Sequence, residues 1–193
     1  MQIKHTSKRL SEEVFFTYND GRAVLIKAVD NVDGKKITKI FRRAGGESVS
    51  VIPVVGDKVI LVRQYRPAVR ESAVGAKEGW LLEVPGGKVN KGESIAAAAA
   101  RELEEETGYK AEKVRFLCRR LLAPYMIDAV DSVFVAENLT KSKSHMDADE
   151  VIELAPTKIS QVEKLIEKGE LSDMASRDAL LHWLYFSRKR KGI

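Results

Sequence analysis

The stretch that decides the fold is Gly87-Lys-Val-Asn-Lys-Gly-Glu-Ser-Ile-Ala-Ala-Ala-Ala-Ala-Arg-Glu-Leu-Glu-Glu-Glu-Thr-Gly-Tyr109. Its middle contains five alanines in succession, and alanine is the strongest helix former. The stretch therefore predicts a helix from about Ser94 to Thr107, with Ser94 as its N-cap and Gly108 as its C-cap. We expect a stripe of small residues to pack this helix against a sheet, formed by Ala96, Ala99, Ala100 and Leu103.

Three carboxylates of this helix lie three and four positions apart, at Glu102, Glu105 and Glu106. At about 100° per residue they share one face, which we expect to be half exposed at the edge of the small-residue stripe. Like charges at this spacing repel each other. A bound divalent cation is the simplest agent that makes such a cluster favourable, so the spacing predicts a metal site. Three glutamates on a solvent-facing helix are the alternative.

Length and composition limit the possible classes of protein. The chain has 193 residues, 44% of them apolar, and a formal charge of +5. It contains no apolar run of membrane-spanning length, and its first ten residues lack the apolar stretch of a signal peptide. The single cysteine, Cys118, forms no internal disulfide, so we expect a cytoplasmic protein. The basic run 188–191 is interpreted as a solvated helix end, with contact to nucleic acid as the alternative.

The rest of the chain alternates between apolar patterns and turn signals, which predicts an α+β fold. Residues 1–10 read as a loose arm, and 19–21 and 31–34 as turns. Gly56 and Asp57 join two strands as a hairpin. Ser172 is the expected cap of the last helix. The predicted strands cover residues 14–18, 23–29, 39–42, 48–55, 58–65, 80–84, 114–122, 130–136 and 151–154, and the predicted helices cover 159–168 and 174–188.

The box from Gly87 to Tyr109 resembles the Nudix signature. A glycine is followed after five residues by Glu93, and after seven more by Arg-Glu-hydrophobic-any-Glu-Glu-any-Gly, with Tyr109 in place of a small aliphatic residue. The resemblance implies a Nudix hydrolase with an α/β/α sandwich built on a mixed β-sheet, plus a small N-terminal β subdomain. We expect the subdomain at residues 1–46 and the hydrolase domain, with its C-terminal helices, at 47–193.

The resemblance also implies a magnesium site, for which Mn²⁺ is a substitute. Glu102 and Glu106 would be the main ligands, and the Gly86 carbonyl oxygen would add another. Glu93 would hold a second metal or favour the positive end of the helix. Arg101 and Glu105 are four residues apart, so an ion pair between them would hold Glu105 in position.

A general base must activate the attacking water, and similar enzymes carry it as a glutamate on a loop after the box. Here that loop is 143–153, where Glu150 is the favoured base and Glu153 the reserve. Glu105, inside the box, is the third candidate for a catalytic role.

A wider likeness points to the ADP-ribose and nucleoside-diphosphate-sugar pyrophosphatase branch. It rests on Arg63-Gln-Tyr-Arg66 and Trp80-Leu-Leu-Glu-Val-Pro-Gly-Gly87. A proline sixteen residues after Gly108 also marks many ADP-ribose hydrolases, but the neighbouring sequence here is Ala123-Pro-Tyr125 in place of their Ser-Pro-Gly. The residues implied in substrate binding are Arg66, Arg43, Arg42, Glu83 and Pro124.

The implied reaction is Mg²⁺-dependent hydrolysis of ADP-ribose or a related nucleoside diphosphate linked to X, which gives AMP or another NMP and phosphorylated X. A dinucleoside polyphosphate, another ADP compound or a GDP-sugar are the alternative substrates. A non-catalytic nucleotide sensor is the alternative from another class. The expected partner is a small-molecule nucleotide, with neither membrane nor nucleic acid, and the resemblance implies a homodimer.

Overall fold

The chain forms two compact units. The computed structural model describes residues 7–17, 24–43, 46–70, 78–143 and 151–190. The first unit comprises Met1–Glu47 and Arg120–Asp131, and the second comprises Ser48–Arg119 and Ser132–Ile193. A segment from the middle of the chain thus belongs to the same unit as the N-terminal strands. Among the described residues, no helix combines the length and the apolar character needed to cross a membrane.

The first unit contains a three-stranded antiparallel sheet in the order β1-β2-β3. Its strands are β1 (Ser7–Thr17), β2 (Val24–Val32) and β3 (Lys35–Arg43). The predicted loose arm is wrong for residues 7–10, which lie in β1. Charged residues conceal the strand pattern there, and Arg9 forms ion pairs with Asp30 and Glu12. The turn predicted at 19–21 lies outside the described residues.

The second unit contains a seven-stranded sheet in the order β10-β5-β4-β9-β8, with β6 paired to β5 and β7 paired to β4. The predicted hairpin between β4 and β5 is confirmed, and Gly56 makes its turn with a φ of 60°. The strands of this sheet are β4 (Glu47–Val55), β5 (Lys58–Tyr65), β6 (Trp80–Glu83), β7 (Gly86–Lys88), β8 (Tyr109–Leu122), β9 (Ala129–Lys141) and β10 (Ile152–Lys158). The helices are η1 (Pro67–Val69), α1 (Ile95–Thr107), α2 (Ile159–Glu167) and α3 (Met174–Arg190).

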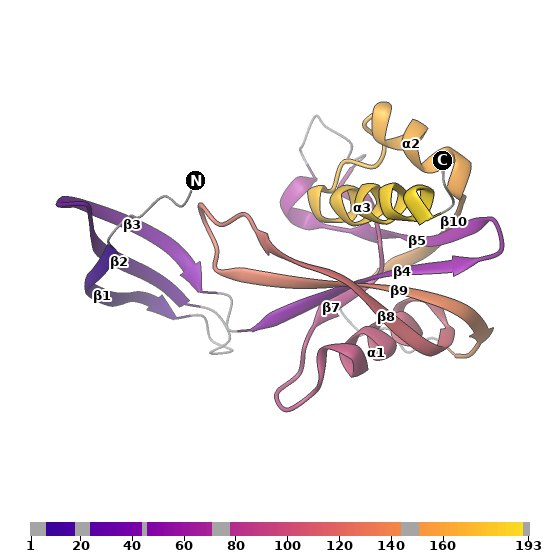
Figure 1. Cartoon of the computed structure of the whole chain (residues 1–193), viewed down its shortest axis with the longest axis horizontal. Helices are drawn as coiled ribbons and strands as arrows, with labels where there is room; N and C mark the ends of the chain where they lie inside the picture. The colour runs from indigo at the N-terminus through magenta and orange to yellow at the C-terminus, as the bar shows by residue number, and fades with distance from the viewer. Residues whose placement is uncertain (1–6, 18–23, 44–45, 71–77, 144–150, 191–193) are drawn as a thin grey trace. The chain divides into compact units, whose positions relative to one another are not determined.

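Helices cover both faces of this sheet, as Figure 1 shows for α1 on one side and for α2 and α3 on the other. Alternate residues of a strand point to opposite faces, and the apolar positions of β4 and β9 follow that rule. The α1 side buries Val49, Val51, Phe134 and Ala136 against Ala98, Ala99 and Leu103. The other side buries Ile52, Leu61, Val133 and Val135 against Leu171, Leu180 and Trp183. The predicted α+β fold, an α/β/α sandwich, is confirmed.

Helix α1 begins and ends where the sequence predicted. The Ser94 hydroxyl accepts a hydrogen bond from the Ala97 N–H at 3.2 Å, and Gly108 is left-handed with a φ of 66°. The predicted stripe of small residues is confirmed at Ala99 and Leu103 and is wrong at Ala96, which is exposed. The buried positions of the helix are Ala98, Ala99, Leu103, Glu106 and Thr107. Five identical residues give no contrast from which the buried face of a helix could be read.

The predicted cap of α3 is also wrong. The Asp173 carboxylate, not the Ser172 hydroxyl, accepts a hydrogen bond from the Ser176 N–H at 2.7 Å. An aspartate one residue before the helix serves as an N-cap as well as serine does, so propensity alone does not choose between them.

Strand β7 was not predicted, because Gly86 and Gly87 read as a break after β6. Its three residues pair antiparallel with Ser48, Val49 and Ser50 of β4. The absence of side chains lets the two backbones meet. A Cβ atom at Gly86 would lie 2.2 Å from the Val49 carbonyl oxygen and 3.0 Å from the Ser50 Cα atom.

We therefore expect Gly86→Ala to lower the free energy of unfolding by about 2–3 kcal/mol, the upper range for overpacking. Both contacts are with backbone atoms, so a strand must move to admit the methyl group. Urea denaturation measures the loss. Gly46→Ala is the matched control, because a Cβ atom there meets nothing within 4 Å. Equal stability of both variants would contradict a tight β4–β7 contact.

Candidate active site

The predicted acidic residues of α1 are buried to different extents. Glu106 is buried, with 4% of its surface exposed, while the side chains of Glu102 and Glu105 are 12% and 34% exposed. The prediction of a half-exposed cluster is therefore wrong for Glu106, because the buried stripe of the helix runs through this residue. The Gly86 N–H donates a hydrogen bond to Oε2 of Glu106 at 3.2 Å, which joins β7 to the helix.

Arg101 connects α1 to the loop that precedes it. Its Nη1 donates to Glu102 at 2.8 Å and to Glu105 at 2.7 Å. Its Nε and Nη2 donate to the two carboxylate oxygens of Glu93 at 3.0 and 3.1 Å, and Nη2 also donates to the Lys88 carbonyl oxygen at 2.9 Å. The predicted ion pair of Arg101 with Glu105 is present, and the same guanidinium also gathers two further carboxylates.

These contacts shift the ionisation of both partners. The hydrogen bonds that Arg101 donates to Glu93 first, and then to Glu105 and Glu102, raise the pKa of Arg101. In return, the Arg101 guanidinium and the Asn90 N–H lower the pKa of Glu93. The Asn90 N–H donates to the Glu93 carboxylate at 3.0 Å. The loop and the helix are therefore held together by groups that stay charged at neutral pH.

The donor set of this cluster fits a hard divalent cation. By formal charge, the cluster sums to three negative charges, from four carboxylates and one guanidinium: Glu93, Glu102, Glu105, Glu106 and Arg101. Within the ranges that the structure describes, no three acidic, histidine or cysteine side chains form a ready-made metal cage. Mg²⁺ usually takes only one or two carboxylates and completes its shell with water and substrate phosphates. An all-oxygen cluster with excess negative charge meets that requirement.

Gly87 makes room for one of these carboxylates. A Cβ atom at this position would lie between 2.3 and 2.6 Å from the carboxylate atoms of Glu102. The β7 backbone therefore lies directly against that carboxylate. This steric role of the first glycine of the box was not predicted from the sequence.

Two of the predicted substrate-binding residues meet in the second unit. Arg66 donates from Nη2 to Glu83 at 2.6 Å, and from Nε to both oxygens of that carboxylate at 3.2 Å. Burial raises the pKa of Glu83, the nearby Asp173 raises it further, and the Arg66 guanidinium opposes this rise. The arginine side chain is 45% exposed and the glutamate side chain 10%. The pair thus combines a buried anion with an accessible cation.

The other predicted substrate-binding residues belong to the first unit. Arg43 forms ion pairs with Glu12 at 2.8 Å and with Asp128 at 3.4 Å. The Arg42 N–H donates to the Met126 carbonyl oxygen at 2.7 Å. Pro124 is exposed in the turn of the same segment, 120–131. These contacts hold the segment against β3.

The predicted bases are divided between described and undescribed parts of the chain. Glu150, the favoured one, lies outside the described residues. Glu153 lies in β10, where it is exposed and stands opposite Arg63 of β5. Glu105 pairs with Arg101.

Two further polar contacts near the site were missed by sequence reasoning. The buried Ser176 hydroxyl of α3 accepts a hydrogen bond from the Val84 N–H at 3.0 Å, just before β7. Glu104, an unspecified position of the box, accepts a hydrogen bond from the Ser142 hydroxyl at 2.6 Å, at the end of β9. Both join segments far apart in the sequence, and single serines carry no local signal for such contacts.

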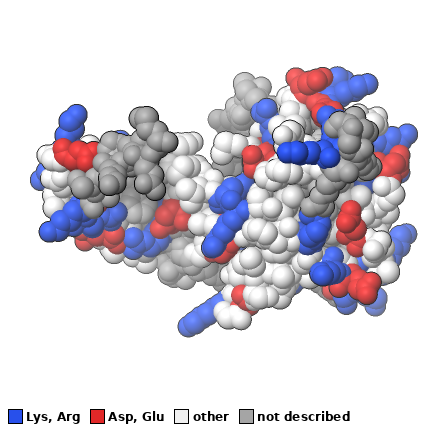
Figure 2. All heavy atoms as spheres, viewed as in Figure 1, with Lys and Arg blue, Asp and Glu red and all other residues white. Residues whose placement is uncertain are grey.

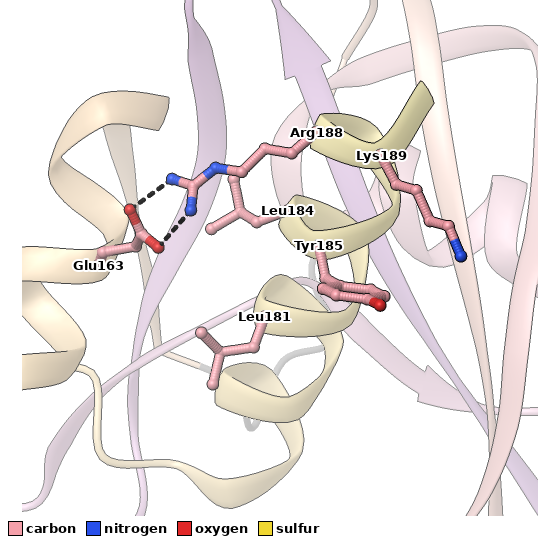
Figure 3. A pocket seen from close by; sticks show the side chains of 6 residues that line it. All are labelled: Glu163, Leu181, Leu184, Tyr185, Arg188 and Lys189. Carbon is pink, nitrogen blue, oxygen red and sulfur yellow. Dashed lines mark hydrogen bonds and ion pairs between the residues drawn. The ribbon is translucent and has the colours of Figure 1, made fainter. Parts of the chain in front are cut away.

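A shallow pocket of about 570 Å³ lies on the opposite face of the sheet, between α2 and α3. Figure 3 shows Glu163 of α2 facing Arg188 of α3 beside Leu181, Leu184 and Tyr185. The two charged side chains form an exposed ion pair with N–O distances of 2.9 and 2.5 Å. Because α1 covers the other face, this pocket does not contain the acidic cluster.

We expect Arg101→Gln to lower the free energy of unfolding by about 2 kcal/mol at neutral pH, because three carboxylates lose a shared charged donor. The pKa of Glu93 is lowered in the folded state, so its contribution is present above its unfolded pKa of about 4.3 and is lost as the pH falls below it. The difference between variant and wild type should therefore shrink on acidification. Urea denaturation at several pH values measures this.

Arg188→Gln is the matched control, because it removes a solvent-exposed ion pair, and exposed pairs contribute little to stability. An Arg101→Gln variant as stable as this control would contradict the role of Arg101 as the connection between loop and helix.

Comparisons with known proteins identify the family. The NUDIX domain model matches residues 46–180. A Bacillus subtilis (strain 168) protein named ADP-ribose pyrophosphatase is 30% identical over 178 residues, which cover 90% of each chain. A Bacillus methanolicus protein named methanol dehydrogenase activator is 31% identical over 169 residues, which cover 84% of each chain.

A solved structure described as an ADP compounds hydrolase superposes with a TM-score of 0.80 over 97% of each chain, at 21% identity, and so shares the fold. The family model covers well over half of the chain, and its signature lies on α1 with the carboxylates gathered around Arg101. The chain therefore belongs to the Nudix family and is a Nudix hydrolase.

Proposed function

We propose that this Nudix hydrolase cleaves the pyrophosphate bond of ADP-ribose, or of a related nucleoside diphosphate linked to X, and that it needs Mg²⁺. The products are AMP or another NMP and phosphorylated X. The observation that carries the proposal is the anionic cluster on α1, where Glu102 and Glu106 lie against the backbone of Gly87 and Gly86. The relative named ADP-ribose pyrophosphatase, which spans nearly the whole chain, supports the substrate class.

In this proposal Glu102 and Glu106 hold the metal, together with the Gly86 carbonyl oxygen, and Glu93 serves a second ion. Mg²⁺, or Mn²⁺ in its place, supplies Lewis-acid chemistry by neutralising charge on the phosphates and lowering the pKa of water. Arg101 keeps Glu93, Glu102 and Glu105 oriented toward one another. Net negative charge at the cluster attracts the cation.

The remaining roles follow from charge and exposure. Arg66 is accessible enough to bind a phosphate oxygen, and guanidinium groups do this with paired hydrogen bonds. Arg42 and Arg43 are weaker candidates for the same contact with phosphate, and Pro124 is a further candidate for substrate binding. We propose Glu150 as the base that takes the proton of the attacking water, with Glu153 as its reserve.

We also propose a cytoplasmic homodimer in which the unit built on residues 1–46 supplies the contact. Its small sheet exposes large apolar side chains, including Val14, Phe16 and Ile40 at 59%, 51% and 54%. Exposed apolar groups of this kind mark protein contacts. Figure 2 shows acidic side chains interspersed among the basic ones on the viewed face of the second unit, which favours a small nucleotide over nucleic acid.

A second candidate is hydrolysis of another ADP compound or of a dinucleoside polyphosphate. The sequence Ala123-Pro-Tyr125 favours this second candidate, because it departs from the pattern of many ADP-ribose hydrolases. In the structure, 75% of the Tyr125 surface is exposed. An exposed tyrosine can stack on a base.

A substrate panel tests the proposal. Purified protein with Mg²⁺ is offered ADP-ribose, an ADP-sugar, a GDP-sugar and a diadenosine polyphosphate, and a coupled phosphatase reports the phosphate released. We expect ADP-ribose to give the largest kcat/KM and EDTA to abolish turnover. Preference for the diadenosine compound would favour the second candidate. A folded protein that hydrolyses none of them would contradict the proposal.

We expect Gly87→Ala to separate activity from stability. The atoms nearest to the added methyl group belong to the end of the Glu102 side chain and not to the backbone, so the melting temperature should stay within about 3 °C of wild type. Displacement of that carboxylate by about 1 Å should lower turnover by about 100-fold. Isothermal titration with Mn²⁺ should show weaker binding, whereas Gly46→Ala should match wild type in all three measurements. Full activity of Gly87→Ala would remove Glu102 from the site.

A further inference from the structure

The backbone beside Arg66 is fixed on two sides at the end of β5. The Arg66 N–H donates to the Gly79 carbonyl oxygen at 2.7 Å, and the Tyr65 N–H donates to the Val151 carbonyl oxygen at 3.1 Å. Gly79 has a φ of 90°, and a Cβ atom there would lie 2.7 Å from the Tyr65 ring. The Trp80 ring packs edge-on against the same tyrosine at a centroid distance of 5.9 Å. The base of the arginine side chain is therefore held firmly.

The far end of the same side chain is fixed by Glu83. Both carboxylate oxygens accept hydrogen bonds from Arg66, through Nε and Nη2. The arginine side chain is 45% exposed, whereas only 10% of the glutamate side chain is accessible. A substrate phosphate would therefore meet the cation and not the carboxylate, which would repel it.

The position of this pair along the chain links it to the acidic cluster. Glu83 ends β6 and precedes Gly86 by three residues, so their Cα atoms lie within about 11 Å of each other. The Gly86 N–H in turn contacts Glu106. An anion held by Arg66 would thus lie near the carboxylates that are proposed to hold the metal.

From this arrangement we propose that Glu83 is a positioning residue that acts through Arg66, rather than a residue that contacts the substrate. It aligns the guanidinium so that its accessible part binds a phosphate of the diphosphate group. The inference rests on the proposed function for the identity of the substrate. It replaces the direct substrate contact that the sequence implied for Glu83.

The ionisation of Glu83 supports this reading. Burial raises its pKa, so the folded state disfavours the carboxylate that the ion pair requires. A buried charge kept against its own desolvation is typical of a functional group. Because the raised pKa disfavours ionised Glu83 in the folded state above its unfolded pKa, a neutral replacement should keep or raise the melting temperature.

A double-mutant cycle tests the proposal with ADP as a diphosphate probe. Binding of ADP is measured by isothermal titration calorimetry for wild type, Glu83→Gln, Arg66→Met and the double variant, and kinetics are measured with ADP-ribose. We expect Glu83→Gln to weaken ADP binding about tenfold, because a misaligned Arg66 would lose about one charge-assisted hydrogen bond to the phosphate. KM should rise more than kcat falls. In the Arg66→Met background the same change should have less than about a twofold effect.

Two controls bracket this result. Glu83→Asp should recover part of the binding, because it keeps the charge. Glu163→Gln removes a carboxylate from a similar arginine pair on the opposite face and should leave ADP binding unchanged. Equal loss of binding in both Arg66 backgrounds, or no loss at all, would overturn the proposal.

The two proposals fail in different ways. A wild type that hydrolyses no substrate of the panel, yet binds ADP in the Glu83-dependent manner, would refute the function and leave the positioning role standing. A wild type that binds no ADP would overturn the positioning role itself, because Arg66 would then anchor no diphosphate.

Discussion

The hydrogen bonds of Arg101 are the interaction on which the site depends. A loop and a helix that each carry carboxylates would repel one another without a cation between them. One guanidinium satisfies Glu93, Glu102 and Glu105 and also binds the Lys88 carbonyl oxygen at the end of β7. It thereby fixes the loop, the helix and the short strand as one body. The remaining negative charge is available to a metal, so structure and chemistry share the same cluster.

The two adjacent glycines show how closely fold and site are joined. At Gly86 the missing side chain lets β7 pair with β4, and at Gly87 it leaves space for a carboxylate of α1. Gly86 is needed for the pairing of the sheet, and Gly87 is needed for the placement of the carboxylate. The box therefore places its glutamates by close approach of the backbone as well as by helix periodicity, and two consecutive residues of β7 serve both purposes.

The sequence predicted the elements whose signals are local. The alanine run, Ser94 and Gly108 defined α1, and turn residues defined the β4–β5 hairpin. Prediction from the sequence failed where tertiary contacts determine which residues are buried or paired. Identical alanines could not reveal which face of α1 is buried, so Glu106 was expected at the edge and lies inside. In the site, helical spacing predicted the Arg101–Glu105 pair, whereas the long-range contact between Val84 and Ser176 gave no signal.

Contacts from both faces of the sheet converge on the short segment between β6 and β7. Ser176 of α3 binds the Val84 N–H, and Asp173, which caps the same helix, raises the pKa of Glu83. On the other face Gly86 contacts Glu106 of α1. Because the sheet lies between the two helices, this segment connects the C-terminal helix with the acidic cluster through hydrogen bonds. Asp173, at the start of α3, therefore acts on the carboxylate that pairs with Arg66, although α3 contributes no residue to the acidic cluster.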